Sequence, residues 1–193
     1  QWQNQFDELI LTTAQQTAVP ARLLKNLFAR ESQFWPGSFQ GMDDTGLGQL
    51  TENGADTTLF WNSSFFEQFC PFVLSEETCG NGYVNIKEEE RAELRRALVG
   101  SVNATCENCP LRIDLPQANY SVGVFAHSMI ANCEQTGQVI KNYTGQNAGE
   151  VASYEDLWKF TLVNYNAGGG CLAEALTYTL GSSLPLTWEN VSP

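Results

Sequence analysis

Apolar residues recur at helical spacing along most of this chain, and no run of alternating apolar and polar residues marks a set of strands. Segments with helical spacing cover roughly residues 19–35, 86–99 and 154–164, and a further one begins near Pro116. Connections rich in Gly, Asp and Asn separate these segments. We therefore predict a mainly α-helical fold with at most a small hairpin between the helices.

The composition is that of an ordinary globular protein. Of the 193 residues, 42% are hydrophobic and 11% are aromatic, which suffices for a single well-buried domain over residues 1–193. No stretch of about 18 apolar residues occurs, so we predict no membrane span. The formal charge of −12 argues against nucleic acid as a partner, because phosphate binding requires clustered Lys and Arg. We expect a monomer.

Six cysteines form an even set, which favours disulfides made in an oxidising compartment. We therefore expect a secreted, periplasmic or cell-surface protein with up to three bridges. Among the many pairings that six cysteines allow, we expect the local closures Cys70 with Cys79 and Cys133 with Cys171. Because no basic, apolar leader precedes Gln1, we expect that any signal peptide has been removed or lies outside this sequence.

The pair Cys106 and Cys109 has the spacing of a zinc knuckle. No second C-x-x-C motif is present and His127 is the single histidine, so we predict no metal site. His127 continues an apolar helical stripe, which is typical of a histidine in a protein core.

The segment 19–35 contains an acid in an unusual place. Glu31 follows Leu27 by four residues and Leu23 by eight, so it continues the apolar stripe of a helix that we expect to end at Pro36. A carboxylate against apolar surface holds its proton more tightly than one in water, which suits a proton donor near neutral pH. The alternative is a helix-end glutamate whose charge reaches solvent.

Three local motifs follow one another along the chain: Glu31-Ser32, Gly46-Leu47-Gly48-Gln49 and Tyr165-Asn166-Ala167-Gly168. Their order and spacing resemble the lytic transglycosylases of the soluble-lytic-transglycosylase type and their goose-type lysozyme relatives. In that family an E-S pair is followed by a proline turn and then by G-L-M-Q. The next motif is E-N-I-x-x-G, which residues 117–123 of this chain resemble, and the last is Y-N-A-G. The resemblance covers residues 19–51 and 113–180. The segment of roughly residues 55–110 contains four of the six cysteines. We therefore expect it to be a disulfide-stabilised insertion within the lysozyme-like domain.

This resemblance implies a lysozyme-like helical domain with a substrate groove for peptidoglycan glycan strands and no cofactor. Glu31 would act as the sole general acid and base on the β-1,4 bond between N-acetylmuramic acid and N-acetylglucosamine. After donating its proton, it would activate the C6 hydroxyl of muramic acid, which attacks within the same sugar and gives a 1,6-anhydro product. The residues that would bind substrate or orient the acid are Ser32, Gly46, Leu47, Gln49, Tyr165 and Asn166.

The chain departs from the family at three positions. Gly48 replaces a Met, which we expect to widen the floor of the groove; Gln40 stands where a Ser is common; and Gly169 replaces a Pro, which loosens a turn. These departures and the acidic charge keep open a glycan-binding module without turnover. Phe34 and Trp35 are candidates both for stacking on sugar rings and for the core.

Most glycosidases use two carboxylates, so the other acids near the motifs matter. Asp44 and Glu52 are the candidates for positioning water, together with Asp43, and any of them would make the enzyme an inverting muramidase of the goose type. Turn formation is the simpler explanation of the Asp43-Asp44 pair. A preference for N-acetylglucosamine polymers also stays open.

Overall fold

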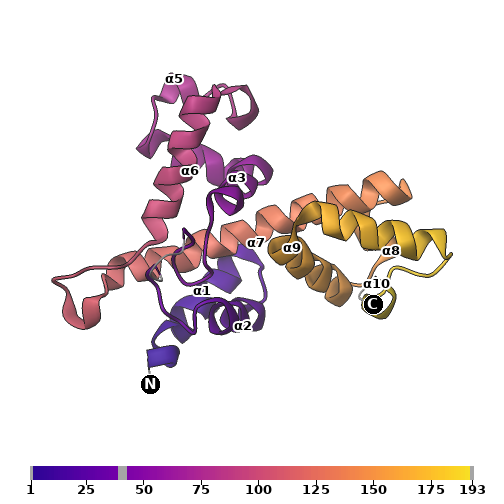
Figure 1. Ribbon diagram of the computed structural model, residues 1–193, viewed down its shortest axis with the longest axis horizontal. Coiled ribbons are helices and arrows are strands. Elements are labelled where there is room, and N and C mark those ends of the chain that lie inside the picture. Colours follow the sequence, from indigo (N-terminus) through magenta and orange to yellow (C-terminus); the bar gives the residue numbers. More distant parts are fainter. Residues whose placement is uncertain (1, 39–42, 192–193) are drawn as a thin grey trace. The chain divides into compact units, whose positions relative to one another are not determined.

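The computed structural model describes residues 2–38 and 43–191, and within them the chain is mainly helical with no β-strand, as predicted (Figure 1). Paired backbone bridges join Ser38 to Thr45 and Thr45 to Leu50 but extend no further. No helix in these ranges is both long and apolar enough to cross a membrane. The helices are η1 Trp2–Phe6, α1 Asp7–Thr17, α2 Ala21–Glu31, α3 Glu52–Trp61, α4 Ser63–Phe69, η2 Cys70–Phe72, α5 Glu76–Cys79, η3 Tyr83–Asn85, α6 Glu88–Val102, η4 Pro110–Arg112, α7 Leu115–Thr144, α8 Ala148–Val151, α9 Tyr154–Gly181 and α10 Trp188–Val191.

The chain forms two compact units, residues 1–130 and residues 131–193, and α7 contributes to both. Each unit has its own buried core. The single domain and the insertion over roughly 55–110 that we expected from the sequence stay predictions.

The first unit is organised around aromatic rings from η1, α2, the loop after α2 and α7. Phe28 packs edge-on against Phe34 and Phe125, at centroid distances of 6.3 and 5.9 Å, and Phe34 stacks on Phe6 at 6.3 Å. All four side chains are at most 1% exposed. Such aromatic contacts bury a large apolar area and fix the directions of the helices that carry them. This core supports the C-terminal end of α2, where Glu31 lies.

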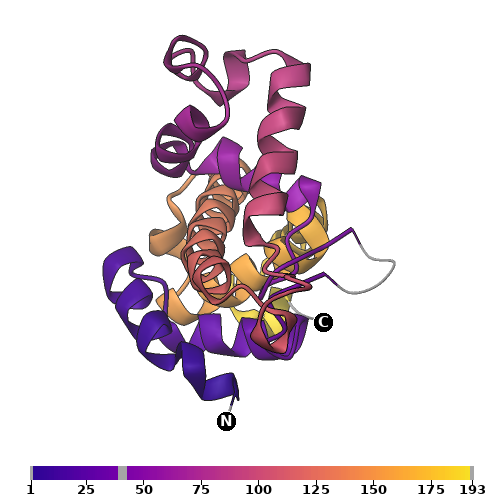
Figure 2. The same cartoon turned by 90° about the vertical axis from the view of Figure 1, so that its left-hand side faces the viewer.

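A second part of the first unit contains α3 to α6, and α3 lies beside α6 in both views (Figures 1 and 2). The helical stretch from Glu52 to Phe69 is divided at Asn62, whose side chain accepts a hydrogen bond from the backbone N–H of Phe65 at 3.0 Å. Asparagine is a favoured N-cap, so it begins α4 as soon as α3 ends. Leu94 and Leu98 of α6 are fully buried, as their spacing predicted.

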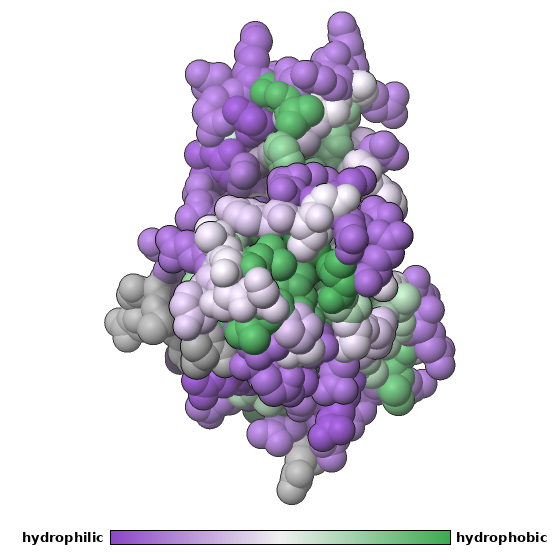
Figure 3. All heavy atoms as spheres, turned by 90° about the vertical axis from the view of Figure 1, so that its right-hand side faces the viewer, coloured by the Kyte–Doolittle hydropathy of each residue, from purple (hydrophilic) through white to green (hydrophobic). Residues whose placement is uncertain are grey.

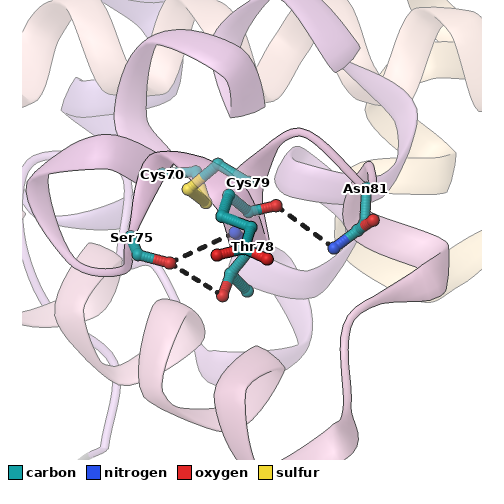
Figure 4. Close-up of a disulfide and its surroundings, with 6 residues drawn as sticks. Cys70, Ser75, Thr78, Cys79 and Asn81 are labelled. Carbon is teal, nitrogen blue, oxygen red and sulfur yellow. Dashed lines mark hydrogen bonds between the residues drawn. A yellow bond between two sulfur atoms is a disulfide. The ribbon is translucent and has the colours of Figure 1, made fainter.

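The expected bridge between Cys70 and Cys79 is confirmed, and it closes the loop between η2 and α5 (Figure 4). Beside it, the hydroxyl of Ser75 caps α5 by accepting from the N–H of Thr78 at 3.2 Å. The Cys106–Cys109 knuckle is a second disulfide.

The predicted pairing of Cys133 with Cys171 is wrong, because both are free thiols. Cys133 is partly buried on α7 and hydrogen-bonds to Thr161, whereas Cys171 is exposed to solvent beyond the kink in α9. Their side chains therefore lie in different surroundings.

The second unit packs α8, α9 and α10 around the C-terminal part of α7. The fully buried side chains of its core are Ile140, Phe160, Leu172 and Leu176, with Leu186 and Val191 beside them. α9 is kinked at Gly168, whose φ of 81° and ψ of 161° suit glycine. The face drawn in Figure 3 is largely hydrophilic, with hydrophobic side chains exposed in several separate places.

Candidate active site

Glu31 is the last residue of α2, and the residues before it explain its position. Leu24, Leu27 and Phe28 are buried on the face that the sequence predicted, and Glu31 continues this face with a partly exposed side chain. Within the described residues its carboxyl group makes no hydrogen bond and no ion pair. An acid held against the core without a fixed partner is free to exchange a proton with a ligand.

Burial is the main reason why the pKa of Glu31 is raised above its ordinary value. The negative charge of Asp44 raises this pKa further, while the neighbouring Arg30 lowers it. Asp44 therefore lies close enough to act on Glu31 electrostatically, and its own side chain is partly exposed. The site combines an acid whose pKa is raised with a second carboxylate nearby.

Ser32 joins the end of α2 to the loop that follows. Its side chain is only 1% exposed, and its hydroxyl donates to the backbone carbonyl of Leu47 at 2.7 Å. Leu47 is itself fully buried. Ser32 and Leu47 therefore hold the loop against α2, and the exposed polar groups of the site come from their neighbours.

The loop turns tightly between Thr45 and Leu50, which exchange two backbone hydrogen bonds of 3.2 and 2.8 Å. Gly46 has a φ of 80°, and a Cβ there would lie 2.8 Å from the backbone oxygen of Val102, so glycine is required. Gln49, with a φ of 56°, donates from its side-chain amide to the Gly46 carbonyl at 2.7 Å. The amide oxygen of Gln49 then remains as an acceptor at a partly exposed position.

The space beside Gly48 is filled by a side chain from α7, and the wider groove floor that we expected stays a prediction. A Cβ at this position would lie 2.4 Å from Cδ1 and 2.6 Å from Cε1 of Phe125. The Phe125 ring therefore occupies the space that a longer side chain would need. The small residue at position 48 and the large ring at position 125 therefore depend on each other for packing.

The two aromatic residues after α2 differ in their surroundings. Phe34 is 1% exposed and its carbonyl accepts from the indole Nε1 of Trp2 at 2.8 Å, so it belongs to the core. Trp35 is partly exposed. Of the remaining acids, Asp43 and Glu52 are exposed and line a cavity of about 610 Å³ together with Arg96. Gln40 lies outside the described residues.

Tyr165 and Asn166 belong to the second unit, in the turn of α9 before the kink at Gly168. Asn166 is exposed and lines a cavity of about 430 Å³ with Lys159 and Trp188. Tyr165 is partly exposed. Glu31, Ser32, the loop 43–50 and Glu52 all belong to the first unit, so their grouping with the tyrosine and the asparagine stays a prediction.

Sequence reasoning missed the buried polar cluster that supports this turn. The side-chain amide of Asn164, a residue 2% exposed, donates to Oδ1 of Asn132 at 3.1 Å and to Oε1 of Gln135 at 2.9 Å. A Cβ at Gly169 would lie 3.2 Å from Oδ1 of Asn164, so glycine at this position lets the backbone approach this cluster. No local signal distinguishes Asn164 from a surface asparagine.

In the described parts of the chain, no three His, Cys, Asp or Glu side chains are grouped so that they would hold a metal ion. The chemistry that the site offers is proton transfer by Glu31, an electrostatic influence from Asp44 and hydrogen bonding by Gln49. Comparisons with models of protein families, with curated proteins and with solved structures found no match to this chain.

Proposed function

We propose that this protein is a peptidoglycan lytic transglycosylase, which cleaves the β-1,4 bond between N-acetylmuramic acid and N-acetylglucosamine. One observation carries the proposal. Glu31 is a partly buried acid at a helix end, with a raised pKa and no hydrogen-bond partner in the described parts of the chain. Such a group is still protonated at a pH where an ordinary glutamate has lost its proton, as a general acid must be.

The proposed reaction uses Glu31 twice. Its proton goes to the glycosidic oxygen, so that the N-acetylglucosamine leaves as an alcohol while positive charge develops at the anomeric carbon of muramic acid. The resulting carboxylate then takes the proton of the C6 hydroxyl on the same sugar, and that oxygen bonds to the anomeric carbon. No water is consumed, and the effective concentration of such an internal nucleophile is very high.

The neighbours of Glu31 support a role in substrate positioning. The hydrogen bond from Ser32 to Leu47 fixes the loop to the end of the catalytic helix, and the loop in turn carries the partly exposed side chain of Gln49 with its amide oxygen. We assign to Gln49 a hydrogen bond from an N-acetyl N–H or a sugar hydroxyl. To Tyr165 and Asn166 of the second unit we assign, from the motif alone, a role in orienting the substrate.

Export is part of the same proposal, because the substrate lies outside the cytoplasm. Two disulfides are compatible with an oxidising compartment. The net charge of −12 means that the chain gains no electrostatic attraction to an acidic wall, so hydrogen bonds and stacking must supply the binding.

The proposal is tested by digesting purified peptidoglycan and measuring the soluble glycopeptides released. Glu31→Gln should abolish release while Glu8→Gln, which changes an exposed acid on α1, should leave it unchanged. Retained binding of insoluble peptidoglycan by Glu31→Gln would show that the loss is chemical. Binding without release by the wild type would exclude the enzyme and leave a glycan-binding module.

A second candidate, an inverting muramidase, is favoured by the closeness of Asp44 to Glu31. In that reaction Glu31 would again be the acid, and Asp44 would activate a water molecule on the far face of the sugar. Asp44→Asn should then remove nearly all turnover. In a transglycosylase the same variant should keep most of its turnover and change mainly the pH dependence.

A further inference from the structure

An aromatic pocket of about 220 Å³ lies in the first unit between α4, η2 and α7, and no proposed step uses it. Its lining side chains include Phe65, Phe69, Phe72, Tyr120 and His127, with Gln68 among them. All lie within the first unit. None of the lining side chains carries a formal charge at neutral pH when His127 is neutral.

The rim of the pocket is unusually apolar for a surface. Phe72 is 85% exposed and Tyr120 is 47% exposed, so both side chains are accessible to a ligand from solvent. The wall behind them is rigid, because Phe65 and Phe69 are nearly buried and stack on each other at 5.8 Å with an interplanar angle of 12°. Exposed aromatics around a hollow are a common feature of ligand sites.

His127 supplies a hydrogen-bond donor whose position and tautomer are fixed. Asn62 accepts from the backbone N–H of Phe65 through Oδ1, at 3.0 Å, so its Nδ2 must point at His127, where it lies 3.3 Å from Nδ1. Since an amide NH₂ group only donates, Nδ1 accepts and the proton sits on Nε2. Its ring stacks on Phe65 at 4.8 Å, and none of the described residues accepts a hydrogen bond from Nε2.

Burial lowers the pKa of His127, so the imidazole is neutral at neutral pH. A pocket with aromatic walls, a neutral N–H donor and no charged lining group suits a neutral ligand that has both an apolar face and polar substituents. Gln68 adds an amide, and Tyr120 adds a hydroxyl. Its volume is below the range of roughly 300–1,000 Å³ that is usual for drug-sized ligands, so one small ring or group fills it.

We propose that this pocket binds a single N-acetylhexosamine residue. The apolar face of the sugar stacks on Phe72, and the carbonyl of the acetamido group accepts the proton of Nε2 of His127. Tyr120 closes the other side of the ring. The pocket thus holds a glycan without cleaving it.

This site is separate from the Glu31 region. Phe125 of α7 packs against Phe28 of α2. His127 lies two residues after Phe125, which is a rotation of about 200° around the helix, and its ring stacks on Phe65 of α4. The inference therefore goes beyond the proposed cleavage and does not depend on it. A protein that cleaves nothing can still bind the sugar here.

The test is an NMR titration of the isotope-labelled protein with methyl β-N-acetylglucosaminide, compared with methyl β-glucoside, which lacks the acetamido group. The first sugar should shift the backbone amide signals around Phe72 and Tyr120 and the Nε2 signal of His127 in a saturable manner. Phe72→Ala should weaken binding about tenfold, the effect expected for losing one stacked ring. Tyr178→Ala, which removes an aromatic side chain 68% exposed on α9, is the matched control and should change nothing.

Three results would overturn the inference. These are the absence of saturable shifts at the pocket, an equal response to the glucoside, and unchanged affinity in Phe72→Ala. Since Phe72 is so exposed, its replacement should preserve the fold, which the unchanged spectrum of the rest of the first unit would verify. The titration measures no cleavage, so its outcome is independent of the peptidoglycan digestion.

Discussion

Replacing Gly48 by alanine should destabilise the first unit, because the added methyl group has no space. Its carbon would lie 2.4 Å from Cδ1 of Phe125, whereas carbon atoms in contact normally lie about 3.5–4.0 Å apart. The ring or the loop must therefore move by about 1 Å. Phe125 is fully buried and packs on Phe28, so the ring has little freedom to yield.

Overpacking of this kind costs about 1–3 kcal/mol. Taking about 2 kcal/mol, and a change of about 2–4 °C in Tm for each kcal/mol, we expect Tm to fall by about 4–8 °C. Calorimetry and chemical denaturation measure this change. The matched control is Gly100→Ala in α6, where a Cβ meets nothing within 4 Å, and which should raise the stability by up to about 1 kcal/mol through helix propensity.

A compensating substitution tests the cause. Phe125→Leu alone should be destabilising because it leaves a cavity, but in the Gly48→Ala background it should recover part of the lost stability. Two results would refute the reasoning. One is a Gly48→Ala variant as stable as the wild type, and the other is a double variant whose loss is the sum of the single losses.

Three further changes follow from the same geometry. Ser32→Ala should lower the free energy of unfolding by about 1–3 kcal/mol, measured by urea denaturation, because a buried carbonyl loses its donor; an unchanged stability would contradict this. Asp44→Asn should lower the pKa of Glu31, since it removes a negative charge that raises that pKa, and should move the alkaline limb of activity to lower pH; NMR titration of the Glu31 carboxyl measures the shift, and an unchanged pKa would refute the electrostatic contact. Alkylation of the unreduced, unfolded chain should label only Cys133 and Cys171, whereas labelling of neither would mean that they are bridged after all.

The parts of the fold that depend on local spacing could be predicted from the sequence. The buried face of α2 follows from apolar residues three and four positions apart, and the kink in α9 follows from Gly168, which adopts a conformation that other residues avoid. The end of α2 could not be placed. We expected it at Pro36, but Gln33 and Phe34 have φ values of 53° and 65°, and the helix ends at Glu31.

The missed features all involve residues distant in sequence. Ser32 is held by a carbonyl in the next loop, and the space at Gly48 is filled from α7, which no local pattern can reveal. The same reason explains why only the closer of the two expected cysteine pairs formed. Residues nine apart, such as Cys70 and Cys79, are brought together by one short loop, whereas the second pair depended on how two helices pack.

The central claim, that Glu31 cleaves a glycosidic bond without water, is tested most directly by the chain ends that it produces. Purified peptidoglycan should be digested and the released glycopeptides analysed by mass spectrometry. The account predicts muramic acid ends in the 1,6-anhydro form with the wild type and none with Glu31→Gln. Reducing ends alone would contradict the intramolecular mechanism, and anhydro ends formed equally by Glu31→Gln would contradict the assignment of the acid.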